Sequence, residues 1–157
     1  MTEVRRFMPV LRIAKLHPQA RLPKRWSNGA VGYDLHAYIM TEYGKPSKTL
    51  VPPCSTVNIA TGLSIETPKD CFMFVCPRSG LGRHSISVTN SPGLIDPDYR
   101  GEIRVLVYNG SYVNFWVEHD MRIAQLVVMP ITPINILEVK ELSSTERGAA
   151  GFGSTGT

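Results

Sequence analysis

The stretch Glu102-Ile103-Arg104-Val105-Leu106-Val107 alternates in character, and the side formed by Ile103, Val105 and Val107 is wholly apolar. Successive side chains of a β-strand point to opposite faces of a sheet. Such alternation therefore predicts a strand that buries one face against a core and leaves the other face more polar.

Comparable short runs rich in Val, Ile, Tyr and Phe lie on both sides of this strand, separated by many of the twelve prolines and thirteen glycines. We expect strands over residues 11–16, 32–38, 56–66, 71–76, 86–89, 103–108, 113–117, 123–129 and 134–139. No segment repeats apolar residues at helical spacing over three turns. Many short strands joined by tight turns predict an all-β sandwich, jelly roll or barrel, and 157 residues suit one domain.

The composition favours a soluble intracellular protein. No apolar run approaches the roughly 18 residues of a membrane-spanning helix, and no signal-peptide pattern follows the charged N-terminus. The three cysteines form no CxxC pair and the four histidines show no metal-ligand spacing. The formal charge of +4 comes from scattered basic residues, so we expect no stable nucleic-acid binding and no membrane association. The location is expected to be cytoplasmic by default, with nuclear or organellar residence also open.

Two turns carry the candidate chemistry. The first, Pro77-Arg78-Ser79-Gly80-Leu81-Gly82, follows an apolar strand and offers backbone N–H groups, a guanidinium and a hydroxyl, which together can hold a phosphate. The second spans residues 90–102, where Pro92-Gly93 predicts the turn of a β-hairpin. Asp96 and Asp98 at its far end are turn caps, or one of them is a general base or a magnesium contact.

The end of the chain, from Arg147 onward, reads RGAAGFGSTGT. By composition alone it is a flexible tail. Its spacing is similar to that of a P-loop, but Ser154 stands in place of the lysine and no helix follows, which excludes a P-loop NTPase. A glycine-rich arm with Arg147, Ser154 and Thr155 can still wrap a triphosphate from outside.

Together these segments resemble the trimeric dUTP pyrophosphatase family (deoxyuridine 5'-triphosphate nucleotidohydrolases), which carries five short motifs in fixed order. The motifs correspond here to residues 30–37 (AVGYDLHA), 77–82 (PRSGLG), 93–102 (GLIDPDYRGE), 122–126 (RIAQL) and 147–156 (RGAAGFGSTG). Departures are small: His36 is bulkier than the usual residue, Asp120-Met121 stands where Gly-Asp commonly precedes Arg122, and Ala149-Ala150 replaces a more polar or glycine pair.

The resemblance implies an all-β, jelly-roll or distorted β-barrel subunit of a homotrimer, with sites shared between subunits. Residues 1–146 would form the domain and residues 147–157 a flexible, glycine-rich arm that closes the site. The implied activity is Mg²⁺-assisted hydrolysis of dUTP to dUMP and pyrophosphate by water attack at the α-phosphorus. This activity would limit uracil incorporation into DNA and supply dUMP for thymidylate synthesis.

The resemblance also assigns roles to individual residues. Asp96 would bond the sugar 3′-hydroxyl and orient the attacking water, and Asp34 would contact magnesium through its waters. Tyr99 would lie under the deoxyribose and exclude a ribose hydroxyl, and Phe152 would stack on the uracil. The full set of implied substrate contacts is Arg78, Ser79, Gly80, Asn90, Gly93, Leu94, Ile95, Asp96, Tyr99, Arg104, Gln125, Arg147, Phe152, Gly153, Ser154 and Thr155.

Two other functions stay open at this point. A dCTP deaminase shares the fold and much of the phosphate site, but it needs a catalytic glutamate at the pyrimidine and a different second motif. A non-catalytic protein on the same scaffold is the other alternative, although Asp34, Asp96 and Arg147 are all intact. Ammonia release from dCTP would indicate the first, and nucleotide binding without turnover the second.

Overall fold

The computed structural model describes residues 9–150, in which nearly all regular structure is β-strand. The elements are β1 (Arg12–Lys15), β2 (Tyr33–His36), β3 (Lys48–Val51), β4 (Ser55–Glu66), β5 (Cys71–Cys76), α1 (Ser79–Gly82), β6 (Ile86–Val88), β7 (Gly93–Ile95), β8 (Glu102–Asn109), β9 (Phe115–Glu118) and β10 (Arg122–Pro130). The prediction of an all-β chain is confirmed.

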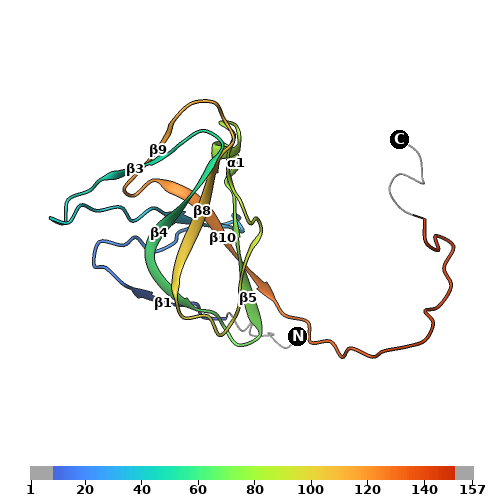
Figure 1. The fold of residues 1–157 in the computed structure, drawn as a ribbon. Helices are drawn as coiled ribbons and strands as arrows, with labels where there is room; N and C mark the ends of the chain where they lie inside the picture. The colour runs from blue at the N-terminus through green and yellow to red at the C-terminus, as the bar shows by residue number, and fades with distance from the viewer. Residues whose placement is uncertain (1–8, 151–157) are drawn as a thin grey trace.

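The strands form two four-stranded antiparallel sheets and a small ribbon (Figure 1). One sheet has the order β1-β4-β8-β6 and the other the order β2-β10-β5-β7, while β3 pairs with β9. Strands far apart in the chain are neighbours in both sheets, which is the arrangement of a jelly roll. Because β10 lies between β2 and β5, it joins two of the motif-bearing segments side by side.

The core lies between the two sheets. Ile103, Val105 and Val107 of β8 have no exposed surface, and Arg104 between them is exposed, so the predicted alternation is confirmed. From the other sheet, Leu35 of β2 and Leu126 of β10 are also fully buried. Burial of these apolar faces is the main stabilising contribution to the fold.

Two sequence-based expectations are wrong. No strand forms over residues 134–139, since every residue from 131 to 150 is exposed and no strand of the described chain lies beside that segment to pair with it. Residues 90–102 do not form a hairpin with the preceding strand, because β6 pairs with β8 in one sheet and β7 pairs with β5 in the other. The turn after β6 therefore carries the chain from one sheet to the other.

The segment after β10 leaves the body of the molecule (Figure 1, orange to red). It presents apolar side chains to solvent, with Ile134 78% exposed, Ile136 94%, Leu137 80% and Leu142 88%. Exposed aliphatic side chains in a row are unfavourable unless another surface covers them. Across the described residues, no helix is long and apolar enough to cross a membrane.

Candidate active site

The first cluster of candidate residues lies where β2, β10 and the turn after β5 meet. Asp34 of β2 is the register partner of Gln125 of β10, and Gln125 is the register partner of Cys76, the last residue of β5. Arg78, Ser79 and Gly80 follow at once. A cavity of about 510 Å³ is lined there by Trp26, Ala30, Val31, Gly32, Asp34, Arg78, Ser79, Gly80, Arg122 and Gln125. We call it the phosphate cavity.

Asp34 anchors an ion-pair network in the wall of the phosphate cavity. Arg78 Nε donates to its Oδ1 at 2.8 Å, and an Arg122 terminal nitrogen donates to its Oδ2 at 3.1 Å. Arg78 also donates to the backbone carbonyl of Arg122 at 3.3 Å. The Asp34 side chain is only 16% exposed, so its charge is largely shielded from water and the two guanidinium groups stay in defined positions.

The side chain of Gln125 packs closely against the backbone of Gly32 in the wall of the same cavity. The Gln125 amide lies over this residue, and a Cβ built on Gly32 would collide with Gln125 Oε1. Gln125 Nε2 in turn donates to the carbonyl of Pro77 at 2.9 Å. The glycine of the first motif is thus required by packing against the fourth motif.

The second cluster of candidate residues surrounds β7 and the turn that follows it. A cavity of about 320 Å³ is lined by Asn58, Asn90, Leu94, Ile95, Asp96, Tyr99, Glu102, Arg104 and Leu106. We call it the nucleoside cavity. It brings together the candidate residues Asn90, Leu94, Ile95, Asp96, Tyr99 and Arg104. Within residues 9–150 the β7 strand has β5 as its one neighbour, so its outer backbone groups are available to a ligand.

Hydrogen bonds fix the polar side chains of the nucleoside cavity. Arg104 donates to Asn58 Oδ1 at 2.9 Å and to Glu102 Oε2 at 2.6 Å. The Tyr99 hydroxyl donates to the Glu102 carbonyl at 3.1 Å, and its ring is 43% exposed over Gly101. Asp96 is exposed, and its carboxylate accepts no hydrogen bond from the described residues.

Within residues 9–150 the candidate residues line two separate cavities. The phosphate and nucleoside cavities share no lining residue. Arg147 lies in the exposed segment after β10, lines neither cavity, and donates to the carbonyl of Ala150 at 3.1 Å. The predicted contacts Phe152, Gly153, Ser154 and Thr155 lie outside the described residues.

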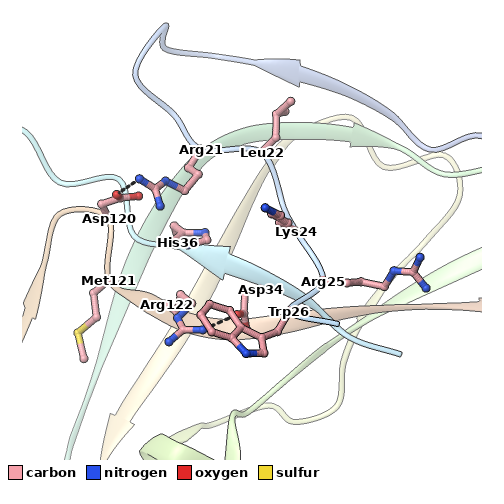
Figure 2. Close-up of a pocket in the computed structure, with 10 residues that line it drawn as sticks. All are labelled: Arg21, Leu22, Lys24, Arg25, Trp26, Asp34, His36, Asp120, Met121 and Arg122. Atoms are coloured by element: carbon pink, nitrogen blue, oxygen red, sulfur yellow. Dashed lines mark hydrogen bonds and ion pairs between the residues drawn. The ribbon is translucent and has the colours of Figure 1, made fainter. Parts of the chain in front are cut away.

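A third cavity of about 880 Å³ adjoins the phosphate cavity, and Trp26, Asp34 and Arg122 line both (Figure 2). Sequence reasoning assigned no role to Trp26 or Arg122. Arg122 has a usable signal, because it is the first residue of the fourth motif, which also contains the predicted contact Gln125. Trp26 had none, because its place beside Arg122, 5.0 Å from guanidinium carbon to ring centre, comes from a loop.

Two groups near these cavities have shifted pKa values. Burial lowers the pKa of His36 below its ordinary value, and the nearby Asp120 carboxylate partly opposes that effect. Burial also raises the pKa of the Cys76 thiol. The imidazole and the thiol are therefore both neutral near pH 7.

The main-chain conformation accounts for one departure from the family motifs. Asp120 has a φ of 68°, in the left-handed region where glycine is favoured and Asp is tolerated. This is the position at which the family commonly has glycine. Its carboxylate forms an ion pair with Arg21.

Comparison with known proteins gives the decisive observation. The family model described as dUTPase matches residues 18–156, nearly the whole chain. The chain belongs to the dUTPase family. Deoxyuridine 5'-triphosphate nucleotidohydrolase of Clostridioides difficile is 44% identical over 147 residues, covering 93% of this chain and 97% of the relative. The protein of the same name from Picosynechococcus sp. is 45% identical over 148 residues, covering 94% and 99%.

Solved dUTPase structures share the fold. The dUTPase of Staphylococcus bacteriophage 80alpha, a mutant solved with dUpNHpp, superimposes with a TM-score of 0.82 at 23% identity and covers 94% of this chain and 99% of its own. A mutant dUTPase from phage phi11 of S. aureus, described with a structural Mg(II) ion, gives a TM-score of 0.74 at 20% identity, covering 86% and 99%. The jelly-roll architecture is therefore that of dUTPases.

Proposed function

We propose that this chain hydrolyses dUTP to dUMP and pyrophosphate, and that the phosphate and nucleoside cavities are two parts of one composite active site. The main support is the phosphate cavity, where Asp34, Arg78, Ser79 and Gln125 from three family motifs line one space. Family membership over residues 18–156 supports the substrate.

The phosphate cavity binds the triphosphate chain in this proposal. Arg78 supplies a guanidinium fork, Ser79 a hydroxyl, Gly80 a backbone N–H, and Gln125 an amide. The arm adds Arg147 together with Gly153, Ser154 and Thr155 at the γ-phosphate. Arg78 already donates to Asp34 through Nε and to the Arg122 carbonyl through one terminal nitrogen, so its other terminal nitrogen is the atom available to a phosphate.

Magnesium is the proposed cofactor, and the residues present fit an ion bound mainly by the substrate. In residues 9–150 no group of three or more His, Cys, Asp or Glu side chains gathers to enclose a metal. Asp34 is a single carboxylate at the edge of the phosphate cavity, which suits contact through the waters that Mg²⁺ keeps. When bound, the ion neutralises charge on the leaving pyrophosphate.

The nucleoside cavity binds the base and sugar. Asn90 and the main chain of Gly93, Leu94 and Ile95 read the uracil edge, and Phe152 stacks on its face. An edge strand offers such backbone donors and acceptors in fixed positions. Cytosine has a donor where uracil has an acceptor, so it would leave buried groups unpaired. Tyr99 lies under the sugar, and Arg104 contacts the sugar and phosphate region.

Asp96 carries the catalytic step. Its exposed carboxylate accepts a proton from a water molecule that attacks the α-phosphorus in line, the bond to the bridging oxygen breaks, and pyrophosphate leaves. Arg78 and Gln125 hold the phosphate chain in position during this displacement. Positioning and charge neutralisation, rather than a covalent intermediate, lower the barrier.

The composite site requires more than one chain, and we propose a homotrimer. The two cavities share no residue, and the exposed apolar segment after β10 needs a surface to cover it. Residues 1–146 then act as the domain and residues 147–157 as the arm that closes a site. We place the enzyme inside the cell, in the cytoplasm, where it limits uracil incorporation into DNA and supplies dUMP for thymidylate synthesis.

One assay tests the function. Pyrophosphate release is measured with dUTP, dTTP, dCTP and UTP, with and without Mg²⁺. We expect an appreciable rate of pyrophosphate release with dUTP but not with the other three nucleotides, and we expect that rate to depend on Mg²⁺. Ammonia from dCTP would instead identify a deaminase, and tight dUTP binding without product would identify a non-catalytic scaffold.

A further inference from the structure

Strand β4 carries a bulge beside the start of β8, its neighbour in the sheet (Figure 1). Ala60 pairs with Arg104 and Ser64 pairs with Glu102, so three residues of β4 lie opposite one residue of β8 between these pairs. Gly62, in the middle of the bulge, has a φ of 68°, where an L side chain is strained. A bulge re-aims the groups around it, and here the Gly62 N–H is directed at the Glu102 side chain.

Glu102 connects this bulge to the nucleoside cavity through the two oxygens of its carboxylate. Oε1 accepts from the Gly62 N–H at 2.8 Å, and Oε2 accepts from Arg104 Nη1 at 2.6 Å. The Glu102 side chain is 20% exposed and the Arg104 side chain 43%, so the carboxylate is the better packed partner. The bulge therefore fixes the carboxylate, and the carboxylate in turn holds the guanidinium.

Asn58 of β4 holds the other side of the same guanidinium. Its Oδ1 accepts from Arg104 Nε at 2.9 Å, and its backbone carbonyl accepts from Arg104 Nη2 at 3.2 Å. Together with the bond to Glu102, these contacts engage three of the five N–H donors of a guanidinium. Within residues 9–150, one N–H on each terminal nitrogen stays available for a ligand.

We propose that Glu102 and Asn58 are positioning residues for nucleotide binding, which hold the Arg104 guanidinium ready at the wall of the nucleoside cavity. This inference rests on the proposed function. All three side chains line that cavity. An arginine side chain loses much conformational entropy when it is ordered, so a guanidinium that is ordered beforehand binds the nucleotide more tightly than a mobile one. The two available N–H groups donate to oxygens of the sugar and phosphate region.

The test removes the acceptor that holds Arg104 and keeps the rest of the Glu102 side chain. In Glu102→Gln the amide oxygen can still accept from Gly62, but the amide nitrogen then opposes the guanidinium, and both are donors. Calorimetric titration of the full chain with a non-hydrolysable dUTP analogue should give a Kd about tenfold above that of the wild type, with little change in thermal stability. Asn58→Ala, a change at an exposed residue, should raise the Kd in the same direction.

A second background shows whether these residues act through Arg104. Arg104→Met keeps a long, unbranched side chain and removes the guanidinium. In the Arg104→Met chain, adding Glu102→Gln or Asn58→Ala should change the Kd by less than about twofold, because the group that they position is gone.

Steady-state kinetics give an independent readout. Glu102→Gln should raise KM for dUTP and leave kcat nearly unchanged, since the weakened contact is made in the ground state and the transition state alike. The Glu102 carbonyl, which accepts from Tyr99, is not altered by this change. The preference for dUTP over UTP should therefore be preserved.

Glu66→Gln is the matched control. Glu66 accepts from Arg12 Nη1 at 2.7 Å across β1 and β4 of the same sheet, and neither residue lines the nucleoside cavity. Exposed ion pairs of this kind contribute little by themselves. The Kd of Glu66→Gln should equal that of the wild type.

Two results would overturn the proposal. One is an unchanged Kd in Glu102→Gln or, where that chain does not fold, in Asn58→Ala. The other is a rise in Kd that is as large in the Arg104→Met background as in the wild type. Absence of analogue binding by the wild-type chain would instead contradict the proposed function, and this inference with it. Binding without turnover would contradict the proposed function alone, because the comparison of Kd values needs no catalysis.

Discussion

Asp96 follows β7 directly, and its exposed carboxylate lines the nucleoside cavity without a hydrogen-bond donor from residues 9–150. We expect Asp96→Asn to keep the fold and nucleotide binding and to lose turnover. The amide is nearly isosteric but cannot accept a proton from water. A general base contributes about 10²–10⁴-fold to the rate, so kcat should fall by that factor. Steady-state kinetics and calorimetric binding of a non-hydrolysable dUTP analogue measure the two effects.

Asp98 provides the matched control for this prediction. It is also an exposed carboxylate, two residues further along the same turn, and it does not line the nucleoside cavity. Asp98→Asn should therefore retain kcat. If Asp96→Asn keeps more than about a tenth of wild-type kcat, the loss is smaller than a general base contributes, and Asp96 is not the base.

Tyr99 is the residue expected to distinguish deoxyribose from ribose. Its ring lies over Gly101 at the edge of the nucleoside cavity. Replacing the ring by alanine removes the steric barrier to a 2′-hydroxyl, so kcat/KM for UTP relative to dUTP should rise about tenfold or more. Tyr99→Phe, which loses only the bond to the Glu102 carbonyl, should keep the discrimination. An unchanged ratio in folded Tyr99→Ala would contradict the assignment.

At the scale of single elements, the sequence predicts most of the strands but not all of them. Alternation over β8 and the apolar run of β5 are sufficient, because each strand buries one face within its own chain. β3 and β7 are not among the predicted strands: Lys48–Val51 begins with two polar residues, and Gly93–Ile95 begins with the glycine of the predicted Pro92-Gly93 turn. The apolar residues at 134–139 predicted a strand that has no neighbouring strand in the described chain.

Asn109, the last residue of β8, joins three elements through one fully buried amide. Its Nδ2 donates to the carbonyls of Val51 and Val113 at 3.0 and 2.8 Å, and its Oδ1 accepts from Ser111. Asn109→Ala leaves these groups unpaired and should cost about 2–4 kcal/mol in the free energy of unfolding. Urea unfolding at equal protein concentration measures it. Asn28→Ala, in an exposed loop, should change stability by less than about 0.5 kcal/mol.

Truncation separates the roles of the exposed segment and the arm. A chain ending at Glu146 keeps the apolar residues Ile134 to Leu142 but loses Arg147 and the glycine-rich motif. We expect this chain to remain assembled, with nearly unchanged thermal stability. Its turnover should fall at least about a hundredfold, because the arm no longer closes the site and its contacts with the phosphates are lost. A chain ending at Pro130 should also lose assembly. Normal turnover by the chain that ends at Glu146 would show that residues 147–157 have no part in the reaction.

At the scale of the whole molecule, the proposed assembly is a trimer with a mass of about 52 kDa, three times 17.4 kDa. Cyclic symmetry lets each of three chains give its phosphate cavity to one site and its nucleoside cavity to another. Light scattering at assay concentration should give this mass. A monomer mass together with full activity would mean that a single chain completes the site alone.

The site was predictable in its parts but not in its arrangement. Motif residues such as Asp34, Arg78 and Gln125 are recognisable from sequence, and the sheet order then brings them to one cavity. The separation of Asp96 from this cavity was not predictable, because it depends on the crossing of the chain between two sheets after β6. Trp26 gave no signal either, since its contact with Arg122 is set by the path of a loop.

The order of strands also bears on how the protein is made. β10 is the last strand of residues 9–150, yet it occupies an inner position of its sheet, between β2 and β5. While a ribosome is still synthesising the chain, β2 and β5 have emerged but lack the strand that pairs with both. Their open edges and apolar faces stay exposed until Pro130 leaves the exit tunnel, which is the condition under which nascent chains aggregate or recruit chaperones. The sheet that contains β2 and β5 can therefore be completed only after β10 has been synthesised, so we expect N-terminal fragments ending before β10 not to fold on their own.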